Sequence, residues 1–236
     1  INAHLLINNK ESFVLKRNEA YIGVLIDDLI TKGTEEPYRM FTSRAEYRTL
    51  LRQDNADLRL SEISNKLGLA SKQRVANVED KRTNTKAFVS FFKKTSVKPE
   101  SINPILSLKN SSEISQSMKL YKLFSRPNIS LDDMLSLESV KLFLEKNDFK
   151  NDVLEQTEVQ VKYSGYIEKE KANAEKLNNL ENIKIPTTFN YSKVQSLSSE
   201  AIQKLNKIKP STLSQASRIS GVSPNDISVL MVYMGR

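Results

Sequence analysis

The C-terminal segment, residues 198–236, carries the signals that most constrain the fold of this chain. Ser198 and Ser223 are residue types that cap helix N-termini, and Pro224 follows at a first helical position. Pro210 and Gly221 separate the apolar patterns of the segment. The apolar residues recur at helical spacing: Ile202, Leu205 and Ile208, then Leu213, Ala216 and Ile219, then Ile227, Leu230, Met231 and Met234. The segment therefore predicts a small bundle of three short helices.

Helical patterns also cover most of the preceding chain. Gly68 is typical of a residue that ends a short helix, and Ser71 of one that starts a long amphipathic helix. Prolines between residues 96 and 130 predict only short helices and loops there. The other helices are expected at the N-terminus up to a turn at residues 8–9, at residues 61–67, at 131–146 as one or two helices, and at 155–181.

Two segments near the N-terminus have the composition of β-strands. Residues 13–15 and 21–29 are rich in apolar and β-branched side chains. We therefore expect a mainly α-helical chain that ends in a small helical bundle, with a minor β element near the N-terminus.

The charge and the rare residue types exclude several classes of function. Lys plus Arg number 36 against 28 Asp plus Glu, a net charge of +8 that favours an anionic partner. The chain has no cysteine and one histidine, His4, so thiolate chemistry, disulfides and histidine-rich metal sites are excluded. No apolar run approaches the ~20 residues of a membrane span. We expect a cytoplasmic protein without membrane contact.

A row of arginines follows a loop that contains Gly33 and Pro37. Arg44, Arg48 and Arg52 stand at i, i+4 and i+8, which on a helix places three guanidinium groups on one face. Thr42 or Ser43 would cap that helix. Because burying several arginines is costly, the row favours contact with an acidic partner.

No motif of the sequence forms a catalytic, cofactor or metal site. Asp27 and Asp28 are adjacent, and no third ligand lies at a useful spacing; pairing of one of them with Arg39 or Arg44 is the better interpretation. The six glycines are scattered, without a phosphate-binding loop.

The terminal bundle leaves two interpretations open. Residues 215–230 resemble a helix-turn-helix, but Asp226 near the start of its second helix would oppose DNA phosphates. Residues 191–236 contain six cationic residues and two acidic ones, and Lys204 and Lys207 share one face of a predicted helix. That face is suited to phosphate-backbone binding, although a solvated helix face would look the same.

Long blocks of the sequence resemble one enzyme family. They are RNEAYIGVLIDDL at 17–29, GTEEPYRMFTSRAEYR at 33–48, LRQDNADLRL at 51–60, VQVKYSGYI at 159–167 and SQASRISGVSPNDIS at 214–228. These blocks are similar to the large FAD-dependent subunit of bacterial tRNA uridine 5-carboxymethylaminomethyl modification enzymes, the MnmG/GidA family. Residues 70–150 match that family only weakly.

The resemblance implies a C-terminal fragment of a longer enzyme. Residues 1–69 would be the tail of an FAD-binding domain with the arginine motif, residues 70–150 a helical linking region, and residues 151–236 a helical domain that binds tRNA and a partner. The family modifies C5 of the tRNA wobble uridine with FAD and NADH, works with a partner GTPase and forms a homodimer. The resemblance places both cofactors mainly outside this chain, so we expect the fragment alone to be inactive.

The resemblance also nominates residues for nucleic-acid binding. By position they are Arg39, Arg44, Arg48 and Arg52 in the arginine motif and Lys204, Lys207, Lys209 and Arg218 in the bundle. Arginine suits this role because its planar fork binds phosphate bidentately. The alternatives are a helical adaptor that contacts only the GTPase and, with less support, a helix-turn-helix DNA-binding protein.

Overall fold

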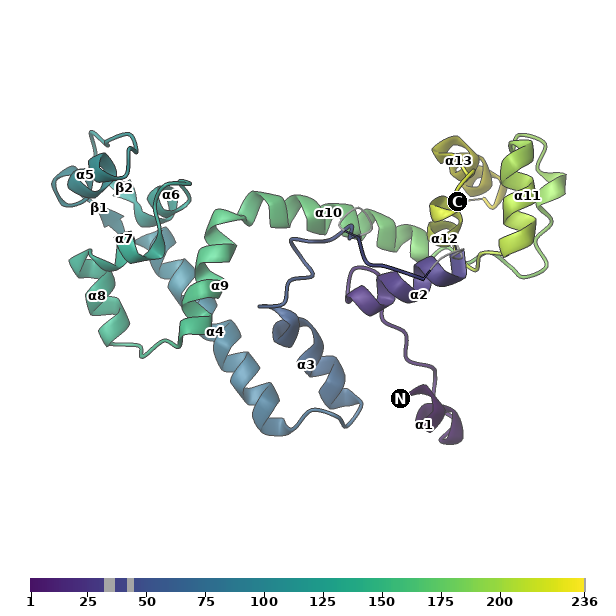
Figure 1. The fold of residues 1–236 in the computed structure, drawn as a ribbon, viewed down its shortest axis with the longest axis horizontal. Coiled ribbons are helices and arrows are strands. Elements are labelled where there is room, and N and C mark those ends of the chain that lie inside the picture. Colours follow the sequence, from purple (N-terminus) through teal and green to yellow (C-terminus); the bar gives the residue numbers. More distant parts are fainter. Residues whose placement is uncertain (32–36, 42–44, 236) are drawn as a thin grey trace. The chain divides into compact units, whose positions relative to one another are not determined.

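The computed structural model describes residues 1–31, 37–41 and 45–235, and it divides into two compact units. Unit 1 combines residues 1–51 with residues 169–236, and unit 2 comprises residues 52–168. Both domain boundaries expected from the sequence, at 69/70 and 150/151, fall inside unit 2. The ribbon in Figure 1 is coloured along the chain, so the two ends that build unit 1 are easily distinguished.

Unit 2 is built on three helices that pack along one another. They are α3 (Ala56–Lys66), α4 (Lys72–Lys94) and α9 (Asn151–Lys162). Both expected signals at the α3–α4 junction are confirmed. Gly68 adopts φ +75° just beyond α3, and the Ser71 side chain accepts a hydrogen bond from the backbone N–H of Arg74.

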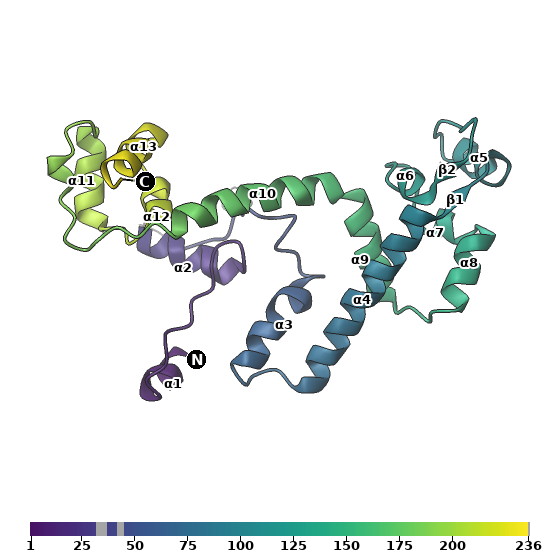
Figure 2. The same ribbon diagram turned by 180° about the vertical axis from the view of Figure 1, so that it is seen from behind.

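A smaller set of elements lies at the C-terminal end of α4. It contains α5 (Pro99–Leu108), α6 (Leu120–Phe124), α7 (Leu131–Leu135), α8 (Glu138–Glu145), β1 (Ser96–Val97) and β2 (Met118–Lys119). The two strands pair antiparallel, Ser96 opposite Lys119 and Val97 opposite Met118. Figures 1 and 2 show both strands beside α5 and α6. The short elements expected between residues 96 and 146 are confirmed, and the strand pair was not foreseen.

Phenylalanines hold this end of unit 2 together. Phe88 and Phe92, four residues apart on α4, are fully buried and meet edge to face with ring centroids 5.0 Å apart. Phe143 on α8 stacks on Phe91 at 4.0 Å and on Phe88 at 5.6 Å. Fully buried aromatic rings are among the largest contributors to core stability.

Unit 1 contains α1 (Asn2–Ile7), α2 (Tyr21–Thr31), the part of α10 (Ser164–Glu181) from residue 169 onward, the 3-10 helix η2 (Tyr191–Lys193) and the terminal bundle. The bundle comprises α11 (Ser199–Ile208), α12 (Leu213–Arg218) and α13 (Pro224–Tyr233), which confirms the three expected helices. Ser198 caps α11, and Ser223 forms a capping box with Asp226 at the start of α13.

The mainly helical fold class is confirmed, but the expected strands near the N-terminus are wrong. Residues 13–15 lie outside regular structure, and residues 21–31 form α2. The buried residues Val24, Asp28 and Thr31 follow helical spacing, which here prevails over the β-propensity of the isoleucines. Gly23 is required on this helix because a Cβ would lie 2.3 Å from the carbonyl oxygen of Lys16. In the described residues, the strand pair lies at 96–97 and 118–119.

The single long helix expected over residues 155–181 is also wrong. Tyr163 ends α9 with φ −103° and ψ 11°, and α10 begins at Ser164. The Ser164 hydroxyl donates to the carbonyl oxygen of Val161, and Gly165 is a poor helix former. A local polar contact therefore divides a segment whose apolar spacing alone is continuous.

We predict that Phe88→Ala will destabilise unit 2 by about 3–5 kcal/mol, because it leaves a cavity among several rings. Hydrogen exchange of the α9 amides that open with unit 2 should become faster by the factor that corresponds to this loss of stability. Thr83→Ala, at an exposed position of the same helix, should change the exchange by at most about 0.5 kcal/mol. Phe88→Leu should fall between the two, and equal exchange in all three variants would contradict the assigned core.

Candidate nucleic-acid interface

The arginine motif is not the continuous helix expected from its spacing. Residues 46–50 form consecutive turns, with the backbone N–H of Leu51 donating to the carbonyl oxygen of Tyr47 at 2.7 Å. Tyr47 and Leu51 are buried and pack with Ala174 of α10, while the Leu50 N–H donates to Glu170 at 3.0 Å. Anchoring to α10 therefore shapes this segment. Arg44 and its proposed caps, Thr42 and Ser43, lie outside the described residues.

The other arginines of the motif have different surroundings. Arg39 and Arg48 are exposed on unit 1. Arg52 belongs to unit 2, where its side chain is 19 % exposed and its Nε contacts Asp54 at 3.0 Å. Burial alone would raise the pKa of Asp54, but hydrogen bonds from Arg52 and Gln156 lower it below its ordinary value. The structure thus gives Arg52 an internal partner and leaves Arg39 and Arg48 at the surface.

A buried arginine missed by the sequence reasoning organises the N-terminal part of unit 1. Arg17 contacts Asp28 at 2.7 Å, Asp27 at 3.0 Å and Glu46 at 2.9 Å, with its side chain 7 % exposed. Burial alone would lower the pKa of Arg17, but its bonds to Glu46 and Asp28 raise it above the ordinary value. Its partners Asp27 and Asp28 were visible in the sequence, but their pairing with Arg17 depends on α2 being a helix.

Arg218 extends this ionic network to the terminal bundle. From α12 its Nε contacts Asp27 at 2.8 Å, and its Nη2 contacts Glu181 of α10 at 3.0 Å. Asp27 and Asp28 therefore pair with Arg17 and, for Asp27, with Arg218. The expected pairing of one aspartate with Arg39 or Arg44 stays a prediction, because Arg44 lies outside the described residues. Arg218 is 12 % exposed, so its guanidinium serves the fold of unit 1.

Three lysines nominated for binding lie on and just beyond α11. Lys207 and Lys209 are exposed and Lys204 is half-buried, whereas Ala201 and Leu205 of the same helix are fully buried. Lys209 ends the helix in the left-handed conformation, φ 53°. The helix therefore places its apolar face in the core and its ammonium groups outside, as the periodicity predicts.

Asp226 does not face outward, which corrects the argument against DNA binding. It is 2 % exposed and accepts hydrogen bonds from the N–H groups of Ser198 at 2.9 Å and Ser223 at 2.8 Å. Burial alone would raise the pKa of Asp226, but these bonds and the serine hydroxyls lower it below 3.8. The aspartate joins the starts of α11 and α13, so the helix-turn-helix pattern here is a packing motif.

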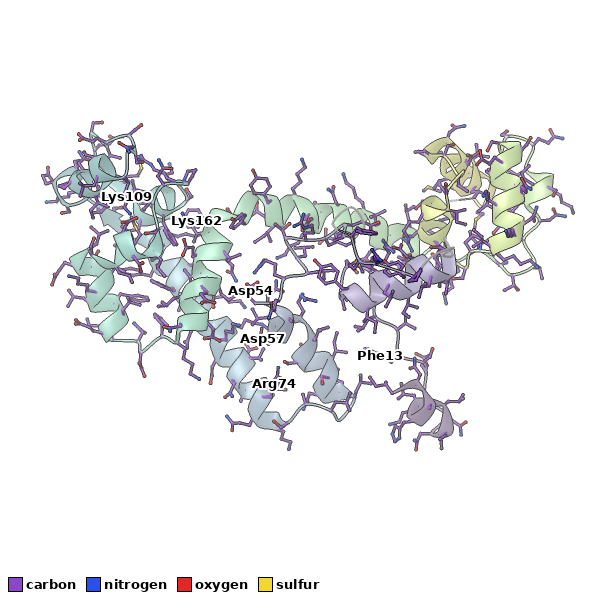
Figure 3. The ribbon with its side chains drawn as sticks, viewed as in Figure 1. Phe13, Asp54, Asp57, Arg74, Lys109 and Lys162 are labelled. Atoms are coloured by element: carbon purple, nitrogen blue, oxygen red, sulfur yellow. The ribbon has the colours of Figure 1, made fainter. Side chains whose placement is uncertain are left out.

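One cavity of unit 2 is lined by charges of both signs. It has a volume of about 340 Å³ between α4, the start of α3 and the start of α9. Lys81 on its wall contacts Asp57 at 3.0 Å and Asp152 at 3.6 Å. Figure 3 labels Asp57 and Arg74, two of the lining residues. Within the described ranges no cluster of three metal-ligating residues occurs.

No helix in the described part of the chain is long and apolar enough to span a membrane. The fold and the distribution of charge thus define a class of basic, mainly helical chains that end in a capped three-helix bundle.

Two family models match almost all of the chain after residue 71. The C-terminal helical domain of the tRNA modifying enzyme MnmG/GidA matches residues 72–171, and the C-terminal helical bundle of the same enzyme matches residues 173–236. The chain belongs to the MnmG/GidA family and corresponds to its C-terminal helical part.

Individual relatives agree with this assignment. The chain is 62 % identical over 236 residues to the tRNA uridine 5-carboxymethylaminomethyl modification enzyme MnmG of Christiangramia forsetii, and 50 % identical over 244 residues to that of Bacteroides thetaiotaomicron. All of this chain is aligned in both comparisons, but it spans only 38 % of each relative. A crystal structure of Aquifex aeolicus GidA is 40 % identical to this chain in sequence and superposes on it with a TM-score of 0.76. The match covers all of this chain and 36 % of the GidA chain.

We predict that Arg218→Met will destabilise unit 1 by about 3 kcal/mol, because it removes the cationic partner of Glu181 and leaves Asp27 with Arg17 alone. Hydrogen exchange of the α2 and α12 amides should report the loss. Lys66→Met breaks an exposed ion pair with Glu62 and should leave hydrogen exchange in unit 2 close to that of the wild type. A cost for Arg218→Met no larger than that of Lys66→Met would contradict the structural role of Arg218.

We predict that acid will loosen the terminal bundle through Asp226. A carboxylate whose pKa is lowered by folding stabilises the fold above its unfolded value of 3.8, and this stability is lost as the pH falls through the folded value. Hydrogen exchange of residues 199–233 should therefore accelerate as the pH falls below about 5 and through the lowered pKa of Asp226 in the folded state. Asp226→Asn should be less protected at neutral pH and respond less to acid, whereas Asp132→Asn, at an exposed position in unit 2, should behave as the wild type.

Proposed function

We propose that this chain is the tRNA- and partner-recognition part of a flavin-dependent enzyme that modifies C5 of the tRNA wobble uridine. The observation that carries the proposal is the family match, since the relatives are named tRNA uridine 5-carboxymethylaminomethyl modification enzymes. The exposed cations of unit 1 give that substrate a surface to meet, because RNA binding depends on neutralising backbone phosphates.

The proposal assigns tRNA contact first to exposed cations of unit 1. These are Arg39, Arg48, Lys207 and Lys209, to which the half-buried Lys204 is added. Arg44 keeps its nomination from the resemblance alone. Arg52 and Arg218 bind internal carboxylates, so within this proposal they position the surface and do not grip the tRNA.

The proposal assigns FAD and NADH to the part of the enzyme that this chain does not span. A dinucleotide cradle needs glycines where the ligand's phosphates approach the backbone. Of the glycines that the structure describes, Gly23 is packed against the carbonyl oxygens of residues 15 and 16, and Gly221 against Glu200. A Cβ at Gly68, Gly165 or Gly235 would meet nothing within 4 Å. These residues do not fit a flavin site, and we derive no redox step from them.

The same proposal includes a partner GTPase, a homodimer of the whole enzyme and a cytoplasmic location, all implied by the family. An adaptor that contacts only the GTPase would use the same exposed lysines. The two functions are separated by titrating the chain with tRNA and, separately, with the GTPase.

We predict that Lys204→Glu with Lys207→Glu will weaken binding of a tRNA transcript about tenfold or more and flatten its dependence on salt. The reason is that each ammonium lost removes one counterion-releasing contact. Binding should be measured by filter retention over a series of salt concentrations.

The matched control is Lys171→Glu with Lys176→Glu, which makes the same change of charge at exposed positions of α10. It should retain affinity and salt slope. Unchanged tRNA binding by the α11 variant, together with weakened GTPase binding, would replace tRNA recognition by the adaptor function.

A further inference from the structure

Two segments of unit 2 contain cations and no acids. Residues 81–99 and 114–131 include no Asp or Glu, although the whole chain has 28. Their cations are Lys81, Arg82, Lys86, Lys93, Lys94, Lys98, Lys119, Lys122 and Arg126. None of these residues was nominated from the sequence, and the signal that could have found them is the absence of acids over two long stretches.

The strand pair brings the two segments together at the C-terminal end of α4. The Lys119 ammonium donates to the carbonyl oxygen of Lys94 at 2.6 Å, and the Lys93 ammonium lies 5.1 Å from the ring centroid of Tyr121. Ser96 and Lys119 are paired across the strands, so their side chains lie on the same face of the strand pair. That face is opposite to the one of the buried Val97, because neighbouring residues of a strand point to opposite faces. We call Lys93, Lys94, Lys98, Lys119 and Lys122 the hairpin lysine cluster.

The hairpin lysine cluster is exposed and uncompensated. All five side chains are exposed, and none forms an ion pair with any residue that the structure describes. Two other cations of unit 2 differ: Lys81 contacts two aspartates, and Lys109, labelled in Figure 3, contacts Asp133 at 3.1 Å. Five like charges held close together favour an anionic partner that neutralises them.

The surroundings of the cluster are polar. No large hydrophobic side chain of residues 81–99 or 114–131 is exposed. The exposed neighbours Ser96 and Ser115 carry hydroxyls of the kind that donate to phosphate oxygens. Protein interfaces depend on buried aromatic or aliphatic anchors, and a membrane surface takes up apolar side chains. Residues 81–99 and 114–131 themselves expose neither kind of anchor, whereas dispersed ammonium groups with hydroxyls match a sugar–phosphate backbone.

We propose that the hairpin lysine cluster is a second RNA-backbone contact surface, separate from the lysines of α11. The proposal rests on the proposed function in one respect, that the chain binds RNA. Because ammonium groups bind phosphates without reading bases, this surface contributes affinity and salt dependence and no sequence preference.

The test removes three ammonium groups that make no contact within the described structure. Lys94→Gln, Lys98→Gln and Lys122→Gln are combined, which leaves the Lys119 and Lys93 contacts in place. The control combines Lys66→Gln, Lys72→Gln and Arg74→Gln, an equal loss of charge around the opposite end of α4, about 33 Å away by helical rise. Filter retention of a tRNA transcript by the full chain is measured over a salt series, with poly-glutamate as the competing anion.

The cluster variant should bind the tRNA transcript about tenfold more weakly at low salt, with a salt slope smaller by about 2 to 3. The control should match the wild type in both. Equal losses in the two variants would overturn the proposal, as would no loss in the cluster variant while the wild type binds. If the cluster variant binds tRNA as the wild type does but poly-glutamate no longer competes, the cluster would be assigned to an acidic protein. That result would also overturn the proposal.

Failure of the proposed function gives a different pattern. It would appear as no tRNA binding by the wild type, or as an α11 variant that binds tRNA normally. In the second case a weakened cluster variant still supports the hairpin lysine cluster as an RNA contact.

Discussion

The pairing of Arg17 and Arg218 around Asp27 is the interaction on which unit 1 depends. Asp27 lies on α2 and Arg218 on α12, 191 residues apart in sequence, and their guanidinium–carboxylate contacts are 2.8 Å long. Arg17 closes the other side of Asp27 and also holds Asp28 and Glu46. Closing so long a chain segment is costly in entropy, so unit 1 needs both this network and the apolar core of the bundle. The exposed lysines of α11 keep their position because α12 is anchored to α2 in this way.

Local signals allowed much of the fold to be predicted. The capped helices at 199–208, 213–218 and 224–233 appear where serine, proline, glycine and apolar spacing agree, because each signal satisfies helix-end groups or the core independently of distant contacts. The prediction was wrong where a contact with a residue far away in the sequence determines the local structure. Residues 21–31 have strand-like composition, yet the helix places Asp27 and Asp28 where Arg17 reaches both. The turns of residues 46–50 likewise depend on Glu170, which no local pattern indicates.

The candidate site shows the same limit. Spacing correctly placed Lys207 outside and Leu205 inside, because one helix determines both. The role of Arg218 and the burial of Asp226 could not be predicted in this way, since each depends on a partner from another element. The hairpin lysine cluster was missed for a related reason, because its segments lie far apart in sequence until β1 and β2 pair.

Several arginines and most of the highlighted lysines of this chain have different roles, and the chemistry of their charged groups explains the difference. The planar guanidinium can bind a phosphate or a carboxylate bidentately, and this geometry suits the nucleic-acid role for which the resemblance nominated Arg52 and Arg218. Folded carboxylates compete for the same geometry, and in the structure Asp27, Glu181 and Asp54 hold these arginines at 3.0 Å or less. The ammonium group is compact and strongly hydrated, so it remains in water at the end of an apolar stem. Lysines of α11 and of the hairpin lysine cluster follow this pattern. The surface charge available to an anionic macromolecule is therefore carried mainly by lysine on the two units, with Arg39 and Arg48 on unit 1. Arg17, Arg52 and Arg218 stabilise the scaffold that displays it.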